Sequence, residues 1–120
     1  MSSWWFSWTY DAYRLSKKRA EKKDIPHTIT IEELREIFPE KDDYYCGYCR
    51  NTLKSEKGPM VPESATLDRI IPEKGYTKDN ITIVCNRCNM LKRDVSTSKE
   101  ILEDIEILKN IAEKIKRKNG

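Results

Sequence analysis

The sequence has few apolar residues and no long apolar run. Only 38% of its 120 residues are apolar and 36% are charged, so the core must be small for the length of the chain. No segment approaches the length of a membrane span, and the first residues are aromatic rather than aliphatic, with no basic stretch before them. These absences argue against export. We therefore expect one domain, or one small module with helical extensions, in the cytoplasm.

Histidine is scarce as well, because His27 is the only one in the chain. It follows Ile25-Pro26, which breaks a predicted helix. A lone histidine in a connecting loop is more often incidental than catalytic, and we expect the same of His27.

Four cysteines stand in two pairs of the form CxxC. A short pair of this kind places two sulfurs on one side of a metal ion, and two pairs complete the tetrahedral set that Zn²⁺ prefers. The interval between the pairs is long enough to hold a whole hairpin. The predicted ligands of one structural Zn²⁺ are Cys46, Cys49, Cys85 and Cys88. The alternatives are two disulfides, which require an oxidising compartment, and redox chemistry, which is less expected because matched pairs usually share a metal.

The segment from Ser64 to Asp94 has the pattern of strand, loop, strand and helix. Residues Thr66–Ile71 have strand propensity and end at a proline, and Ile81–Val84 form a second β-branched run after a polar loop. A short helix is predicted directly after the second strand. We expect this compact ββα unit to carry the chemistry.

A helix is predicted on the N-terminal side, over Thr9–Lys23, where glycine and proline are absent. Aromatic residues gather at its start, and we expect them to pack on the rest of the protein or on a second copy. Its end is basic and suits a phosphate backbone, chiefly through Lys17, Lys18 and Arg19. Aromatic residues beside cations also suit stacking on unpaired bases.

Two further helices are expected. Thr30 and Glu33 form a capping-box pattern, which predicts a short helix that runs to about Phe38. Its expected buried face consists of Leu34, Ile37 and Phe38. The last helix is predicted over Lys99–Lys118, where apolar residues recur at helical spacing and are expected to pack on the N-terminal helix or on a partner chain. That stripe comprises Ile101, Leu102, Ile105, Leu108, Ala112 and Ile115.

Several motifs in the central unit occur in a combination that is specific. They are Leu67-Asp68-Arg69-Ile70, Gly75-Tyr76, Asp79-Asn80 and Cys88-Asn89-x-x-Lys92, together with the two CxxC pairs. The segment from Tyr44 to Asp94 thereby resembles the HNH nuclease family, and most closely its small phage and bacterial members with a CxxC…CxxC zinc site. The resemblance implies a small α+β fold, with a ββα-metal core, a pair of zinc knuckles and flanking N- and C-terminal helices.

The resemblance to the HNH family implies a division of the chain into three parts. We expect residues 1–43 to form an N-terminal helical arm with a basic helix and residues 44–94 to form the HNH-like module. Residues 95–120 are expected to form a C-terminal helix on the module or on a partner. The setting that the resemblance implies is a bacterial or phage-infected cell.

The resemblance also implies the roles of individual residues. Asp68 and Asn89 match the positions that bind one catalytic divalent ion, Mg²⁺ or Mn²⁺, and Asn80 matches the asparagine that ties the hairpin loop together. Arg69 stands where the family has the histidine that activates water, and arginine cannot act as a base. Another group (a nearby Tyr, a Glu or His27) can take the proton, hydroxide on the metal can suffice, or the protein no longer cuts. In each case Arg69 can clamp a phosphate.

Two functions are therefore carried forward. The first is a metal-dependent DNA endonuclease that hydrolyses phosphodiester bonds, with nicking as one mode of cutting. The second is a non-catalytic, zinc-stabilised module that binds nucleic acid. The net charge is only +3, but basic residues are concentrated in patches that can bind phosphate. The expected phosphate contacts are Lys17, Lys18, Arg19, Arg69, Arg87, Lys92 and Arg93. A homodimer through the aromatic N-terminal helix or the C-terminal helix is a further expectation.

Overall fold

The centre of the molecule is a two-stranded antiparallel hairpin. A computed structural model describes residues 4–54, 59–93 and 97–119. Strand β1 (Ala65–Arg69) pairs with β2 (Ile81–Cys85), and Asp68 lies opposite Thr82. The predicted hairpin is confirmed, but the first strand ends before Ile71. The reason is that the backbone N–H and C=O of Ile71 bond to the Asn80 side chain, each at 2.9 Å, instead of continuing the ladder.

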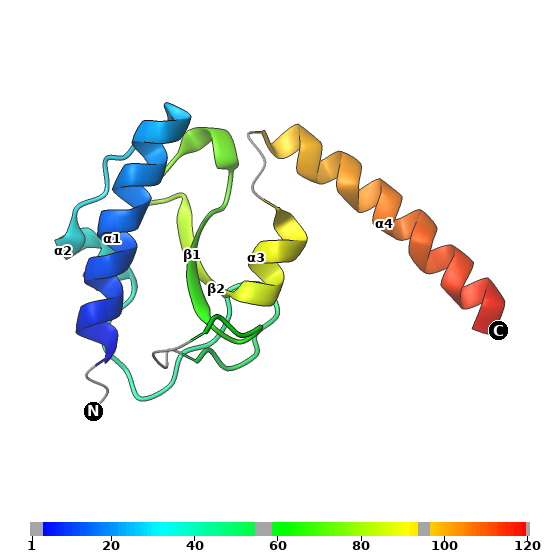
Figure 1. The fold of residues 1–120 in the computed structure, drawn as a ribbon, viewed down its shortest axis with the longest axis horizontal. Helices are drawn as coiled ribbons and strands as arrows, with labels where there is room; N and C mark the ends of the chain where they lie inside the picture. The colour runs from blue at the N-terminus through cyan, green and yellow to red at the C-terminus, as the bar shows by residue number, and fades with distance from the viewer. Residues whose placement is uncertain (1–3, 55–58, 94–96, 120) are drawn as a thin grey trace.

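Besides the hairpin, the described residues form four α-helices and one short 3₁₀ helix. They are α1 (Trp4–Lys23), α2 (Ile31–Ile37), η1 (Pro72–Lys74) in the hairpin loop, α3 (Asn86–Lys92) and α4 (Ser98–Asn119). Figure 1 shows the hairpin between α1 and α3, with α4 extending away from the rest of the molecule. Helix α1 starts at Trp4 rather than at the predicted Thr9, so the aromatic segment is itself helical.

The capping box of α2 is formed as predicted. The Thr30 hydroxyl accepts from the Glu33 N–H, and the Glu33 carboxylate accepts from the Thr30 N–H, each at 3.1 Å. Leu34 and Phe38 are buried, but Ile37 is 38% exposed, so its predicted place in the core was wrong. Leu34 and Phe38, four residues apart, lie on the face that meets the core, and Ile37 lies at the edge of that face.

The aromatic start of α1 packs within this chain. The indole N–H of Trp5 donates to the carbonyl of Phe38 at 2.6 Å, and that of Trp8 donates to the carbonyl of Ala65 at 3.2 Å. The Trp4 ring meets the Tyr44 ring edge-on, with 5.0 Å between centroids. These contacts join α1 to the module, and they leave the basic end of the helix exposed.

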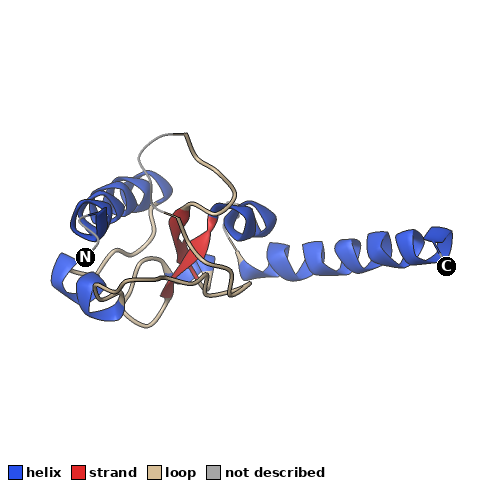
Figure 2. Ribbon diagram, turned by 90° about the horizontal axis from the view of Figure 1, so that it is seen from below, coloured by secondary structure: helices blue, strands red, loops and turns tan. Residues whose placement is uncertain are grey.

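Helix α4 is joined to the module through polar contacts at its base. The Ser98 N–H donates to Glu73 at 2.8 Å, and Arg93 donates to Asp104 at 2.7 Å. Seen from below, α4 is a single rod that runs away from α1, so its apolar stripe does not pack on the N-terminal helix (Figure 2). The expected boundary between residues 94 and 95 lies outside the described residues. None of the described helices is apolar enough over a sufficient length to span a bilayer.

His27 belongs to the aromatic packing around Tyr76. Its ring lies 5.5 Å from the rings of both Tyr13 and Tyr76, measured between centroids. Its Nε2 lies 2.9 Å from the Ser16 hydroxyl, which itself donates to the Tyr13 carbonyl. The Nε2 atom therefore carries the hydrogen, and a neutral ring satisfies this site.

Protonation of His27 should lower the stability of the protein. Burial, and secondarily the charge of Lys17, lower the pKa of His27 below 6.5, so the folded state favours the neutral ring. This contribution is fully present above the unfolded pKa of about 6.5 and is lost as the pH falls through the lower, folded value. Urea unfolding should show a falling free energy of unfolding between about pH 7 and pH 5. His27→Gln should flatten that slope, and an unchanged slope would contradict this assignment.

Candidate functional site

The four cysteines meet at one point of the fold. All are free thiols, and their sulfurs lie within 4.8 Å of one another. Cys46 Sγ accepts from the N–H groups of Tyr48 and Cys49, at 3.3 and 3.4 Å. Cys85 Sγ accepts from the Cys88 N–H at 3.4 Å in the matching turn. Two equivalent knuckles therefore face each other, in an arrangement that can bind a metal ion, and the alternative of two disulfides is not found.

The electrostatics of the cluster favour a cation. Burial opposes ionisation of Cys46, but backbone N–H donors outweigh it and lower its pKa to about 6. Burial and the neighbouring sulfurs raise the pKa of Cys88 to about 12. The first thiolate therefore forms readily and makes the next ones unfavourable. A divalent cation removes that penalty, because it stabilises all four as thiolates.

Gly47 brings the first knuckle close to β2. Its N–H donates to the Ile83 carbonyl at 2.9 Å, and a Cβ at this position would lie 2.4 Å from the Thr82 hydroxyl. The glycine is thus needed for close approach between two segments, which holds Cys46 and Cys49 against the strand that leads to Cys85.

Asp68 lies near the end of β1 with its carboxylate largely buried. The side chain is 10% exposed, and Oδ2 accepts two short bonds of 2.6 Å, one from the Tyr48 hydroxyl and one from the Lys92 ammonium. Burial, and then the Asp68 carboxylate, raise the pKa of Tyr48 well above its usual value. Tyr48 therefore stays protonated and serves as a donor, so it cannot take a proton from water.

Lys92 was expected at a phosphate, and the structure gives it a different set of partners. Its ammonium also donates to the Tyr48 hydroxyl at 3.0 Å, to the Ile70 carbonyl at 2.8 Å and to the Arg69 carbonyl. The side chain is only 11% exposed. Four acceptors hold this cation inside the module, so contact with a phosphate would require these bonds to break.

Asn80 fastens the hairpin loop from within. Its amide nitrogen donates to the Ile71 and Gly75 carbonyls at 2.9 and 2.8 Å, and its oxygen accepts from the Ile71 N–H. Asn80 is 6% exposed and so has no direct access to a substrate. These bonds fix the end of β1, where Asp68 and Arg69 lie.

Arg69 is largely buried beside the loop. One guanidinium nitrogen donates to the Pro72 carbonyl at 3.0 Å, and the guanidinium carbon lies 5.5 Å from the centre of the Tyr76 ring. His27 lies against the same ring of Tyr76, and Arg69 and Tyr76 line a cavity that His27 does not.

This cavity brings five of the predicted site residues together. It has a volume of about 230 Å³, and Asp68, Asn89 and Tyr76 contribute to its wall. Three arginines line it from three different elements or their ends: Arg19 from α1, Arg69 from β1 and Arg93 after α3. Among the described residues, the lining contains no histidine and no glutamate. One carboxylate, one amide and three guanidinium groups form a site suited to a bound anion and a cation.

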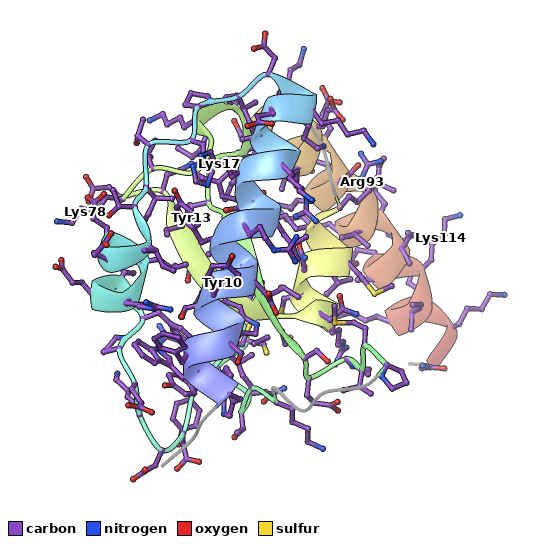
Figure 3. The ribbon with its side chains drawn as sticks, turned by 60° about the vertical axis from the view of Figure 1, so that its left-hand side comes forward. Tyr10, Tyr13, Lys17, Lys78, Arg93 and Lys114 are labelled. Carbon is purple, nitrogen blue, oxygen red and sulfur yellow. The ribbon has the colours of Figure 1, made fainter. Side chains whose placement is uncertain are left out.

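Not every predicted phosphate contact reaches this cavity. Lys17, Lys18 and Arg87 are exposed but do not line it, and Lys92 is turned inward. Figure 3 shows Lys17 on α1 and Arg93 beside the start of α4. Tyr48, which bonds to Asp68, was missed from the sequence. Its one signal was its place inside the first CxxC pair, next to the segment that must approach β2.

Comparison with known proteins agrees with the fold. Residues 46–94 match the family model described as HNH endonuclease. The structure is similar to that of the rare-cutting HNH restriction endonuclease PacI, with a TM-score of 0.59 and 18% identity, over 78% of this chain and 70% of that protein. An uncharacterized protein of Acanthamoeba polyphaga mimivirus is 34% identical over 83 residues, which are 69% of this chain and 14% of the viral protein. The predicted resemblance to the HNH family is confirmed for residues 46–94, as is the small α+β fold.

Removal of the bound metal should unfold the module. The protein as purified should contain one tightly bound metal ion per chain, and a strong chelator should abolish the cooperative thermal transition, because binding at such sites is coupled to folding. Cys85→Ser should have the same effect, while Ser98→Ala, at the base of α4, serves as the control. Elemental analysis and circular dichroism measure both effects. A metal-free protein that unfolds cooperatively at the same temperature would contradict the assignment.

The ion pair of Asp68 and Lys92 should show strong energetic coupling. Asp68→Ala leaves a buried ammonium without its charge partner, which typically costs about 3–5 kcal/mol. The double variant Asp68→Ala, Lys92→Met removes both charges and should regain part of that loss. The parent, Asp68→Ala, Lys92→Met and the double variant are compared by chemical denaturation with the cysteine-bound metal present. The coupling energy from these four proteins is expected at about 1–3 kcal/mol. Simple additivity of the two substitutions would show that the pair is not formed.

Proposed function

We propose that the protein is a metal-dependent DNA endonuclease of the HNH type, which hydrolyses phosphodiester bonds. The observation that carries the proposal is the cavity in which Asp68 and Asn89 lie with Arg19, Arg69 and Arg93. A phosphodiester presents one negative charge and planar sets of acceptor oxygens, which guanidinium groups match well. The family match over residues 46–94 supports the same reaction class.

Zinc is the metal proposed for the four cysteines, and its role there is structural. Four sulfur ligands fill a tetrahedral site and leave no position open for a substrate. The cluster lies at the junction of β2 and α3, so its contribution to the reaction is to hold α3, and with it Asn89, against β1.

A second, divalent ion is proposed between Asp68 and Asn89. Mg²⁺ and Mn²⁺ prefer oxygen ligands, and the cavity offers a carboxylate and an amide that fit this preference. The Tyr48 and Lys92 bonds to the Asp68 side chain both go to Oδ2. Oδ1, to which no described residue donates, is therefore the proposed ligand atom. The ion would polarise the scissile phosphate and stabilise the leaving oxygen.

The remaining roles in the proposed reaction are assigned to side chains of this protein. The three arginines bind and orient the phosphate, and Asn80 keeps the loop in place. Lys92 and Tyr48 fix the Asp68 carboxylate. Arg69 cannot accept the proton of the attacking water, and His27 and Tyr48 are excluded by position and by protonation respectively. The exposed Lys17 and Lys18 extend the basic surface along α1 and are the proposed contacts to the DNA backbone beyond the cut.

A second candidate function is a nucleic-acid-binding module without catalysis. The observation that favours it is the Lys92 ammonium, 2.6 Å from Asp68 Oδ2, because this internal cation partly neutralises the charge that a divalent ion needs. The presence of arginine at position 69, which cannot act as a general base, also favours this second candidate. Both functions predict binding to DNA, and only the first predicts cleavage.

Cleavage should depend on Asp68. Purified protein should nick or cut plasmid DNA when Mg²⁺ or Mn²⁺ is added, and Asp68→Asn should reduce cleavage to background because it removes the one negative charge of the proposed ligand pair. Asp79→Asn removes a carboxylate from an exposed loop position nearby and should cut like the parent. DNA binding and cysteine-bound metal are measured in parallel. Absence of cleavage by the parent with either ion, despite DNA binding, would favour the second candidate.

A further inference from the structure

Helix α4 carries an apolar seam with the spacing of a coiled coil. Five of its eight apolar residues recur in alternating steps of four and three, the heptad pattern by which two helices pack side by side. The seam consists of Ile101, Ile105, Leu108, Ala112 and Ile115. With 22 residues, the helix is about 33 Å long, which accommodates three heptads.

This seam is largely uncovered in the described part of the chain. Ile105, Leu108 and Ile115 are 40%, 49% and 55% exposed. At the base of the helix the seam opens into an apolar groove of about 480 Å³, with Ile70 and Leu91 on its other wall. Helices in water gain most of their stability from packing of an apolar face. An uncovered seam of this length is therefore expected to pack against another apolar surface, which is its occupant.

The charges of α4 identify that occupant. The first half, residues 98–108, holds one lysine and four acidic residues: Glu100, Glu103, Asp104 and Glu106. The second half, residues 109–119, holds Glu113 and five basic residues: Lys109, Lys114, Lys116, Arg117 and Lys118. Two copies of this helix side by side in parallel would place like charges together along their whole length. In the antiparallel orientation each acidic half lies against a basic half.

We propose that α4 pairs with α4 of a second copy of this chain, in the antiparallel orientation. The seams match when Ile105 lies opposite the partner's Ile115 and Leu108 lies opposite the partner's Ala112. The interface is then symmetric, with the same surface contributed by both copies. The basic end of each helix reaches toward the apolar groove at the base of the other, and Lys118 comes near the partner's Asp104.

The oligomeric state and its charge dependence test the proposal. Sedimentation of the full chain, over a range of concentrations at low ionic strength, should show a monomer–dimer equilibrium that added salt weakens. Lys116→Glu with Lys118→Glu changes charges that flank the seam, and should weaken the dimer by about tenfold or more. In a parallel dimer the same change would relieve repulsion and tighten association. Lys114→Glu with Arg117→Glu makes an equal charge change on the outer face and should have a smaller effect.

Substitution in the seam completes the test. Ile105→Asp with Leu108→Asp should give a monomer, and cysteine-bound metal and near-unchanged circular dichroism of the module show that it is folded. A parent chain that is monomeric at every concentration overturns the proposal. So does a dimer that survives the seam substitutions, which would use another surface, or one that the Lys116 and Lys118 changes tighten.

Discussion

The meeting of four sulfurs is the constraint on which the rest of the module depends. The described core is divided into two small clusters, and Leu67 of the hairpin packs against both. Cys46 and Cys85 are buried in one of them and bring a loop, a strand end and a helix start to one point. Thiols this close are unfavourable as anions without a cation. Metal binding and packing of the hairpin therefore stabilise the same state.

The same junction sets the chemistry. Cys85 is the last residue of β2 and the N-cap of α3, so the cluster fixes where that helix begins. Asn89 lies one turn further on and faces the cavity, and Lys92 lies nearly a turn beyond it and reaches Asp68 on β1. Lys92 has two consequences: it fixes the carboxylate, and it reduces the negative charge available to a divalent ion. For the proposed ion to bind, Asp68 must serve both the internal ammonium and an external metal, through different oxygens.

Local patterns made much of this predictable. The CxxC pairs, the capping box of Thr30 and Glu33, and the β-branched strands are specified by neighbours in the sequence, and the structure confirms them. What sequence could not supply depends on segments that meet only in the fold. Lys92 turns inward because the end of β1 and the residue after it offer a carboxylate and two carbonyls, from Asp68, Arg69 and Ile70. Tyr48 reaches Asp68 because Gly47 allows its loop close to Thr82. Neither the inward turn of Lys92 nor the contact between Tyr48 and Asp68 can be derived from residue spacing in the sequence.

A crystal grown in the presence of Mn²⁺ tests the central claim most directly. Anomalous scattering distinguishes the two proposed metal positions, because zinc and manganese absorb at different energies. The expected result is a zinc peak at the four sulfurs and a separate manganese peak between Asp68 and Asn89, with the manganese peak absent from the Asp68→Asn variant. A parent crystal with zinc at the cysteines, and with the Lys92 ammonium but no manganese beside Asp68, would contradict it.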